Sequence, residues 1–229
     1  MHLASFFTYL QYYHGRILSA TIEHILIVCY SLPPAVLLGV SAGVFAASRP
    51  RLARILIGLA GVIMTIPSLA LFGLMVVVLA PFGLGLGALP AVCAIILYSF
   101  LPIIRNTTAA LAGVDPGALE AARGMGLSPA QILFRIKLPL ALPVIMAGVR
   151  SAMVLGVGVA AFAFLVAAGG LGYFVIAGIG RSNIYMVVTG TILISMLGIA
   201  INVFLLKTED WLTPRGLQLA AKQRRSGQL

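Results

Sequence analysis

Five apolar stretches, each long enough to cross a lipid bilayer, dominate this sequence of 229 residues. A bilayer core of roughly 30 Å is crossed by about 20 residues of α-helix. An open strand would leave backbone N–H and C=O groups without partners in lipid, whereas a helix pairs them internally. The sequence therefore predicts an all-α polytopic membrane protein with about five transmembrane helices. The expected spans are residues 25–47, 55–80, 89–110, 140–168 and 184–206.

The composition agrees with this class. Hydrophobic residues make up 61% of the chain and charged residues only 9%, whereas soluble domains average about 45–50% apolar and about 25% charged residues. The net charge of +10 raises the question of nucleic-acid binding. The basic residues, however, are scattered between apolar spans and form no stripe with interleaved aromatic residues. We therefore expect no nucleic-acid partner.

The basic residues also predict the orientation in the membrane. They concentrate in the segment between the first two expected spans, in the segment between the third and fourth, and in the tail 207–229. With five spans these regions fall on one side, which the positive-inside rule assigns to the cytoplasm. The N-terminus is then outside. Residues 1–24, rich in Phe and Tyr, are expected to form a separate amphipathic segment at the outer interface.

One polar segment lies between the third and fourth spans and carries two helix start signals. Asp115 is a favourable N-cap and is followed by Pro116 at the first helical position. The pattern repeats with Ser128 and Pro129, and Gln131 completes a capping box. The sequence thus predicts two helices of about nine residues, each shorter than the roughly 12–15 residues that an isolated helix needs. They must dock on something, either a partner protein or the membrane surface.

The same segment carries a specific motif. Its fixed positions match the pattern E-A-A-x3-G-x9-I-x-L-P, with Glu120, Ala121, Ala122, Gly126, Ile136, Leu138 and Pro139. This is the EAA motif, and the chain resembles the permease subunits of binding-protein-dependent ABC importers. The resemblance implies that residues 25–206 form an ABC transmembrane type-1 domain. It also implies that the loop 113–139 forms coupling helices, seated in a cleft of a cytoplasmic ATPase subunit.

The family resemblance also implies the remaining partners. These are a second permease subunit, identical or related, and an external solute-binding protein, all at a bacterial inner membrane. Within the family, segments 66–72, 101–107, 114–116 and 169–172 are similar to permeases for osmoprotectants such as glycine betaine, choline and carnitine. Related permeases for amino acids and sulfonates share parts of these segments and are the alternative.

Several kinds of site are missing from the sequence. No G-x-x-x-x-G-K-[ST] phosphate loop occurs, and we find no catalytic or metal-ligand constellation. We therefore expect no enzyme activity and no cofactor in this chain, with ATP and Mg bound by the partner subunit. No Asp or Glu falls well inside an expected span, which argues against a proton-coupled carrier. A small channel or carrier that works alone remains the competing class.

Four aromatic residues in the third and fourth spans are candidates for lining a solute path. Aromatic rings hold quaternary ammonium groups through cation–π interactions. The candidates are Tyr98, Phe100, Phe162 and Phe164. The alternative is that they pack inside the protein or face lipid.

Overall fold

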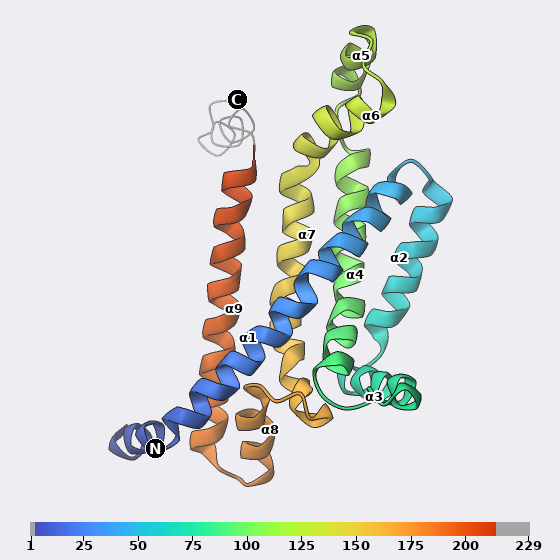
Figure 1. The fold of residues 1–229 in the computed structure, drawn as a ribbon. Helices are drawn as coiled ribbons and strands as arrows, with labels where there is room; N and C mark the ends of the chain where they lie inside the picture. The colour runs from blue at the N-terminus through green and yellow to red at the C-terminus, as the bar shows by residue number, and fades with distance from the viewer. Residues whose placement is uncertain (1–2, 214–229) are drawn as a thin grey trace.

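The chain forms an elongated helical bundle, shown in Figure 1 as a computed structural model that describes residues 3–213. His2 and most of the basic tail lie outside the described residues. The described elements are α1 (Leu3–Ala47), α2 (Pro50–Thr65), α3 (Ser68–Leu79), η1 (Ala80–Phe82), α4 (Ala88–Ala112), α5 (Pro116–Gly124), α6 (Pro129–Ile132), the π-helical turn η2 (Leu133–Lys137), α7 (Leu138–Val159), η3 (Ala160–Val166), α8 (Gly172–Gly180) and α9 (Ile184–Leu212).

The expected all-α membrane architecture is confirmed. Within residues 3–213, four helical stretches are long and apolar enough to cross a membrane, and the bent pair α2–α3 makes a fifth if it is counted as one span. Helix α4 lies at the centre, in contact with α1, α2, α3 and α7, while α9 packs on α7 and α8. The main core lies between α1, α3, α4 and α7 and includes Phe72, Ile95 and Met153.

Small residues allow α1 and α4 to pack closely. Gly39 and Gly43 of α1 lie against Ile103 and Thr107 of α4, where an added Cβ would come within 2.8 and 2.6 Å of those side chains. Their spacing of four residues places both on one face of the helix. Association of helices in lipid depends on such close packing.

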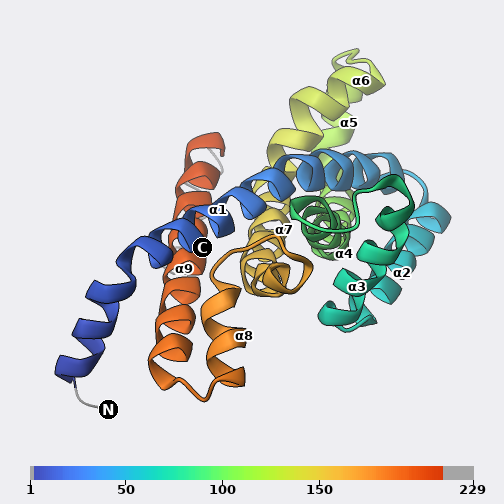
Figure 2. The same cartoon turned by 60° about the horizontal axis from the view of Figure 1, so that its bottom comes forward.

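Helix α1 differs from the prediction at its start. Residues 1–24 were expected to form a separate interfacial segment, but the described part of this region already belongs to α1, which runs for 45 residues. Figures 1 and 2 show α1 crossing the bundle obliquely. No proline or helix-ending glycine pair interrupts residues 3–32, so nothing local breaks the helix before the apolar stretch. Tyr9 of this region stacks on Tyr185 at the start of α9.

The second expected span is broken in the middle. Helices α2 and α3 meet at an angle of 102°, with Ile66 in an extended conformation before Pro67. Proline disfavours the helical conformation in the residue that precedes it and has no N–H to donate. The hydroxyl of Tyr98 in α4 donates a hydrogen bond to the Ile66 carbonyl. The break is therefore capped by a side chain from a neighbouring helix.

A second irregular region joins α7 to α8 and is fastened to α1. The Glu23 carboxylate accepts a hydrogen bond of 2.8 Å from the Gly170 N–H, and Nε2 of the buried His24 lies 3.1 Å from the Val157 carbonyl oxygen. Glu23 lies within α1 because the helix begins at Leu3. The first span expected from the sequence, residues 25–47, begins after Glu23 and contains no carboxylate, whereas the observed helix α1 includes Glu23. We call Glu23, His24 and residues 167–172 the α1–α8 corner.

Substitution of Gly172 tests how closely the backbone segments of this corner are packed. A Cβ at Gly172 would lie 1.7 Å from the Ala161 carbonyl oxygen, so Gly172→Ala must displace backbone. We expect a loss of about 1–3 kcal/mol, typical of overpacking, measured as a lower thermal unfolding temperature in detergent. Gly180→Ala on the same helix is the control, because a Cβ there meets nothing within 4 Å. Equal stability of the two variants would contradict the close approach.

Candidate functional site

The polar segment between α4 and α7 projects beyond the end of the helical bundle (Figure 1). Its first helix, α5, has nine residues. The Asp115 carboxylate accepts a hydrogen bond of 3.0 Å from the Ala118 N–H, and Pro116 occupies the first turn, where no N–H is needed. Local sequence chemistry alone therefore fixes where α5 begins.

The second start signal also forms, but the helix that follows does not end. The Ser128 N–H donates to Gln131 Oε1 at 2.8 Å, and the Gln131 N–H donates to Ser128 Oγ at 3.3 Å. We expected a separate helix of about nine residues. Instead α6 continues through the π-turn η2 into α7, giving one helical body over Pro129–Val166. Pro139 follows closely after the wider π-turn, inside this continuous body, and has no N–H to donate to it.

The EAA residues divide between the surface and the interior of the projection. Glu120 and Ala121 are exposed, whereas Ala122 is buried and its carbonyl accepts from the Leu127 N–H at 3.2 Å. Gly126 has a φ of +78°, a left-handed angle that favours glycine, and its Cβ position meets no atom within 4 Å. Ile136, Leu138 and Pro139 are half-buried at the junction with α7.

Two exposed apolar side chains were not singled out in the sequence. Met125 is 69% exposed and Phe134 is 67% exposed, both on the projection. Their signal in the sequence is an apolar residue within a polar, capped segment. Together with the exposed carboxylate of Glu120, they give the projection both apolar and charged surface, a combination suited to contact with another protein.

Three of the four candidate aromatic residues make internal contacts, and the fourth lines a groove. Tyr98 is buried and bonded to Ile66, as described above. Phe162 packs against Phe72 with ring centroids 6.4 Å apart, and Phe164 against Tyr173 at 5.4 Å. Phe100 lines an apolar groove formed by α1, α2 and α4.

A different surface combines a groove with polar side chains. A groove of about 510 Å³ runs between α7 and α9. Gly158 and Gly198 hollow it, and Ser195 and Asn202 supply its polar groups. Neither polar side chain forms a hydrogen bond within residues 3–213. Beyond the groove, Arg150 of α7 pairs with Glu209 of α9 at 3.0 Å. The sequence did not indicate the groove, because it combines residues about 40 positions apart.

A helical membrane bundle with broken spans and a capped projection of this kind defines a transport permease subunit. Residues 38–216 match the model of the family described as binding-protein-dependent transport system inner membrane component, and the chain belongs to this family. It is therefore a multi-pass inner-membrane protein and an ABC importer permease subunit.

Individual relatives are similar over almost their whole length. The osmoprotectant import permease protein OsmW of Salmonella typhimurium is 42% identical over 204 residues, covering 89% of this chain and 95% of the relative. The choline transport system permease protein OpuBB of Bacillus subtilis is 36% identical over 210 residues, covering 92% and 94%.

Solved structures share the fold. An inward-facing structure of the MetNI methionine ABC transporter superposes with a TM-score of 0.77 at 24% identity, over 86% of this chain and 96% of that one. An amino acid ABC transporter with histidines gives a TM-score of 0.66 at 22% identity, over 92% and 98%. At this level of identity the likeness concerns the fold alone.

Proposed function

We propose that this permease subunit passes a quaternary ammonium osmoprotectant, of the glycine betaine, choline or carnitine type, into the cell. The observation that carries the proposal is the 42% identity to an osmoprotectant permease over nearly the full length of both chains. Relatives named for choline and for glycine betaine, carnitine and choline transport, at 36% and 33% identity, point to the same chemical class.

The projection is the proposed contact with a cytoplasmic ATPase. Glu120, Ala121 and Met125 are among its exposed residues, and α5 is shorter than an isolated helix needs to be stable. ATP and Mg are bound by that partner, since this chain has no phosphate loop. ATP binding would move the ATPase subunits, and the projection would pass this motion to α7, so that the helices switch between two arrangements.

The groove between α7 and α9 is the proposed lining of the solute path. An Asn side chain without a partner is costly in lipid, so Asn202 is better placed facing water or another subunit. Two permease subunits, identical or related, would enclose the path with their grooves. Ser195 and Asn202 are neutral, and no carboxylate lines the groove. The path would let a cation pass without holding it, and an external binding protein would select the solute.

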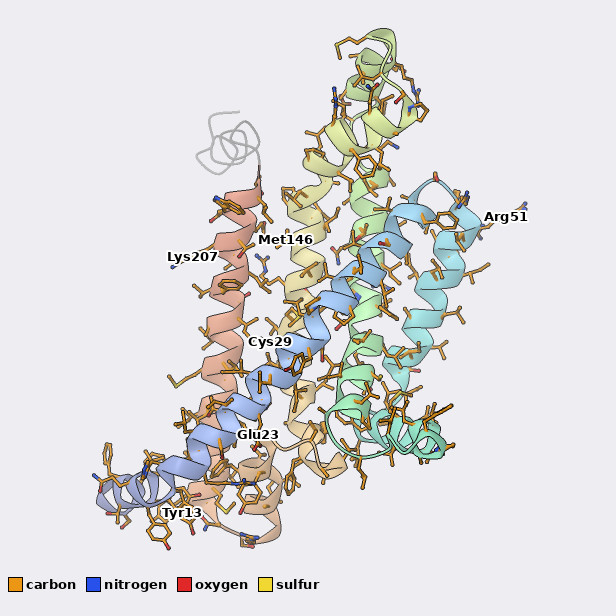
Figure 3. All side chains as sticks on the ribbon, in the orientation of Figure 1. Tyr13, Glu23, Cys29, Arg51, Met146 and Lys207 are labelled. Atoms are coloured by element: carbon orange, nitrogen blue, oxygen red, sulfur yellow. The ribbon has the colours of Figure 1, made fainter. Side chains whose placement is uncertain are left out.

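The orientation follows from the position of the basic residues. The projection, the α1–α2 corner with Arg49, Arg51 and Arg54, and the end of α9 lie toward the same end of the bundle (Figures 1 and 3). We assign this end to the cytoplasm by the positive-inside rule. The C-terminus is then cytoplasmic, and the N-terminus is outside.

Substitution of Gly126 tests the coupling. We expect Gly126→Asp to lower ATP-driven uptake about tenfold or more while the complex still assembles. The Cβ position is open in this chain, so an added carboxylate would meet the ATPase rather than the permease. Gly83→Asp is the matched control, since Gly83 has a similar φ of +72° and equally open space, with a comparable strain of about 1–2 kcal/mol. Normal uptake by Gly126→Asp in an assembled complex would refute the proposed contact.

The solute can be identified in proteoliposomes that contain the permease, its ATPase and its binding protein. We expect ATP-dependent accumulation of radiolabelled choline or glycine betaine, because the relatives are named for the transport of osmoprotectants and of choline. Unlabelled carnitine should compete, and methionine or taurine should not. Accumulation of an amino acid or a sulfonate instead would overturn the substrate assignment, and uptake without the ATPase would indicate a carrier that works alone.

The groove is tested by removing its amide. Asn202→Leu should lower uptake several-fold with assembly intact, because an apolar side chain replaces a group that can be solvated along the path. Thr191→Leu is the control, since Thr191 is an exposed polar residue of α9 outside the groove. Equal uptake by the two variants would remove Asn202 from the path.

A further inference from the structure

A second cavity lies at the base of the projection and has no role in the proposed transport path. It has a volume of about 530 Å³, within the range of about 300–1,000 Å³ typical of small-ligand sites. Its walls come from the end of α1, the end of α4, α5, and the start of the helical body α6–η2. Arg123, Lys137 and Ser48 supply its polar side chains, and Val44, Leu111, Ile132 and Leu133 contribute apolar walls.

No described residue neutralises the two cationic side chains of the cavity. Neither Arg123 nor Lys137 forms a side-chain ion pair or hydrogen bond with another of the residues 3–213. Of the carboxylates on the projection, Asp115 is used as a helix cap, and Glu120 makes no ion pair with Arg123. Two unpaired cations lining one cavity favour an anionic ligand, because Arg and Lys bind phosphate through charge-assisted hydrogen bonds.

The cavity lies where α1 leaves the apolar layer. Near its wall residues, Arg49 turns its guanidinium over the exposed ring of Phe45, at 3.9 Å from the centroid. This is the snorkelling arrangement typical of a membrane interface. Figure 3 shows Arg51 at the α1–α2 corner, with the projection extending beyond it. We therefore place the cavity at the level of lipid head groups, with apolar walls continuing toward the core cluster of Leu111, Ala141 and Ile145.

We propose that this cavity binds an anionic phospholipid, with Arg123 and Lys137 holding the phosphate and the apolar walls receiving the first part of an acyl chain. Basic pockets between helices on the cytoplasmic side of membrane proteins bind such head groups. A free phosphate ion would satisfy the cations but leave the apolar walls unused. The walls belong to both the bundle and the projection, so the lipid would stabilise one position of the projection relative to α1. The proposal does not depend on the identity of the solute.

The test uses the permease–ATPase complex in nanodiscs of phosphatidylcholine with increasing phosphatidylglycerol. Retained phosphatidylglycerol is counted by native mass spectrometry after release into detergent. We expect one tightly held phosphatidylglycerol per permease chain, and roughly 30-fold weaker binding in the double variant Arg123→Gln/Lys137→Gln. That change corresponds to about 1 kcal/mol for each cation lost, at about 1.4 kcal/mol per tenfold. Arg51→Gln/Arg54→Gln is the control, because these residues carry the same charge on the same side but line a separate surface pocket.

The possible outcomes are distinct. Equal loss of phosphatidylglycerol in both double variants would show a general surface attraction and overturn the site. Displacement of the lipid by inorganic phosphate at near-stoichiometric levels would show a small-anion site instead. Unchanged lipid retention with loss of ATPase from Arg123→Gln/Lys137→Gln would show a protein contact. If that variant does not assemble, Val44→Phe serves in its place. It keeps both cations and fills the apolar wall, so the proposal requires it to release the lipid.

Discussion

Backbone N–H and C=O groups that lie in a bilayer must find partners within the protein, and in this chain that requirement acts most visibly where helices stop. Within residues 3–213, three irregular points in the apolar helices are each contacted by a side chain from a distant segment. Tyr98 donates to the carbonyl of Ile66 before Pro67. Nε2 of His24 lies 3.1 Å from the carbonyl oxygen of Val157, near the point where α7 is followed by the 3-10 helix η3. Glu23 accepts from the Gly170 N–H in a turn of left-handed residues. Without these bonds the irregular segments would be costly in lipid.

Two of these three side chains, Glu23 and His24, are adjacent residues of α1. Helix α1 therefore contacts both ends of the structural core. At one end, α1 holds the turn between α7 and α8 through Glu23 and His24. Toward the other, it approaches α4 closely through Gly39 and Gly43. Helices α1, α4 and the body of α7 thus form a closely fastened unit. Helix α9 contacts this unit mainly through α7 and otherwise packs on α8, and a groove remains between α7 and α9.

Features governed by local chemistry could be read from the sequence. Asp115 and Ser128 mark helix starts because their oxygens reach the next free N–H groups, and Pro67 interrupts its span because of its own ring. Features that depend on distant residues could not. Glu23 and Gly170 are 147 positions apart, and Arg150 and Glu209 are 59 apart. Nor could the local pattern show that α6 continues through Pro139, since a proline often ends or kinks a helix but can also lie inside one, as Pro102 does in α4.

The π-turn over Leu133–Lys137 has a mechanical consequence. Because it keeps the helix continuous, the 38 residues of Pro129–Val166 form one rod, on the order of 55 Å long at 1.5 Å per residue. No loop separates the Pro129 end of this body from α7. In the transport cycle proposed above, a movement of the projection would be passed along this body toward η3 and the corner where Glu23 and His24 hold the chain.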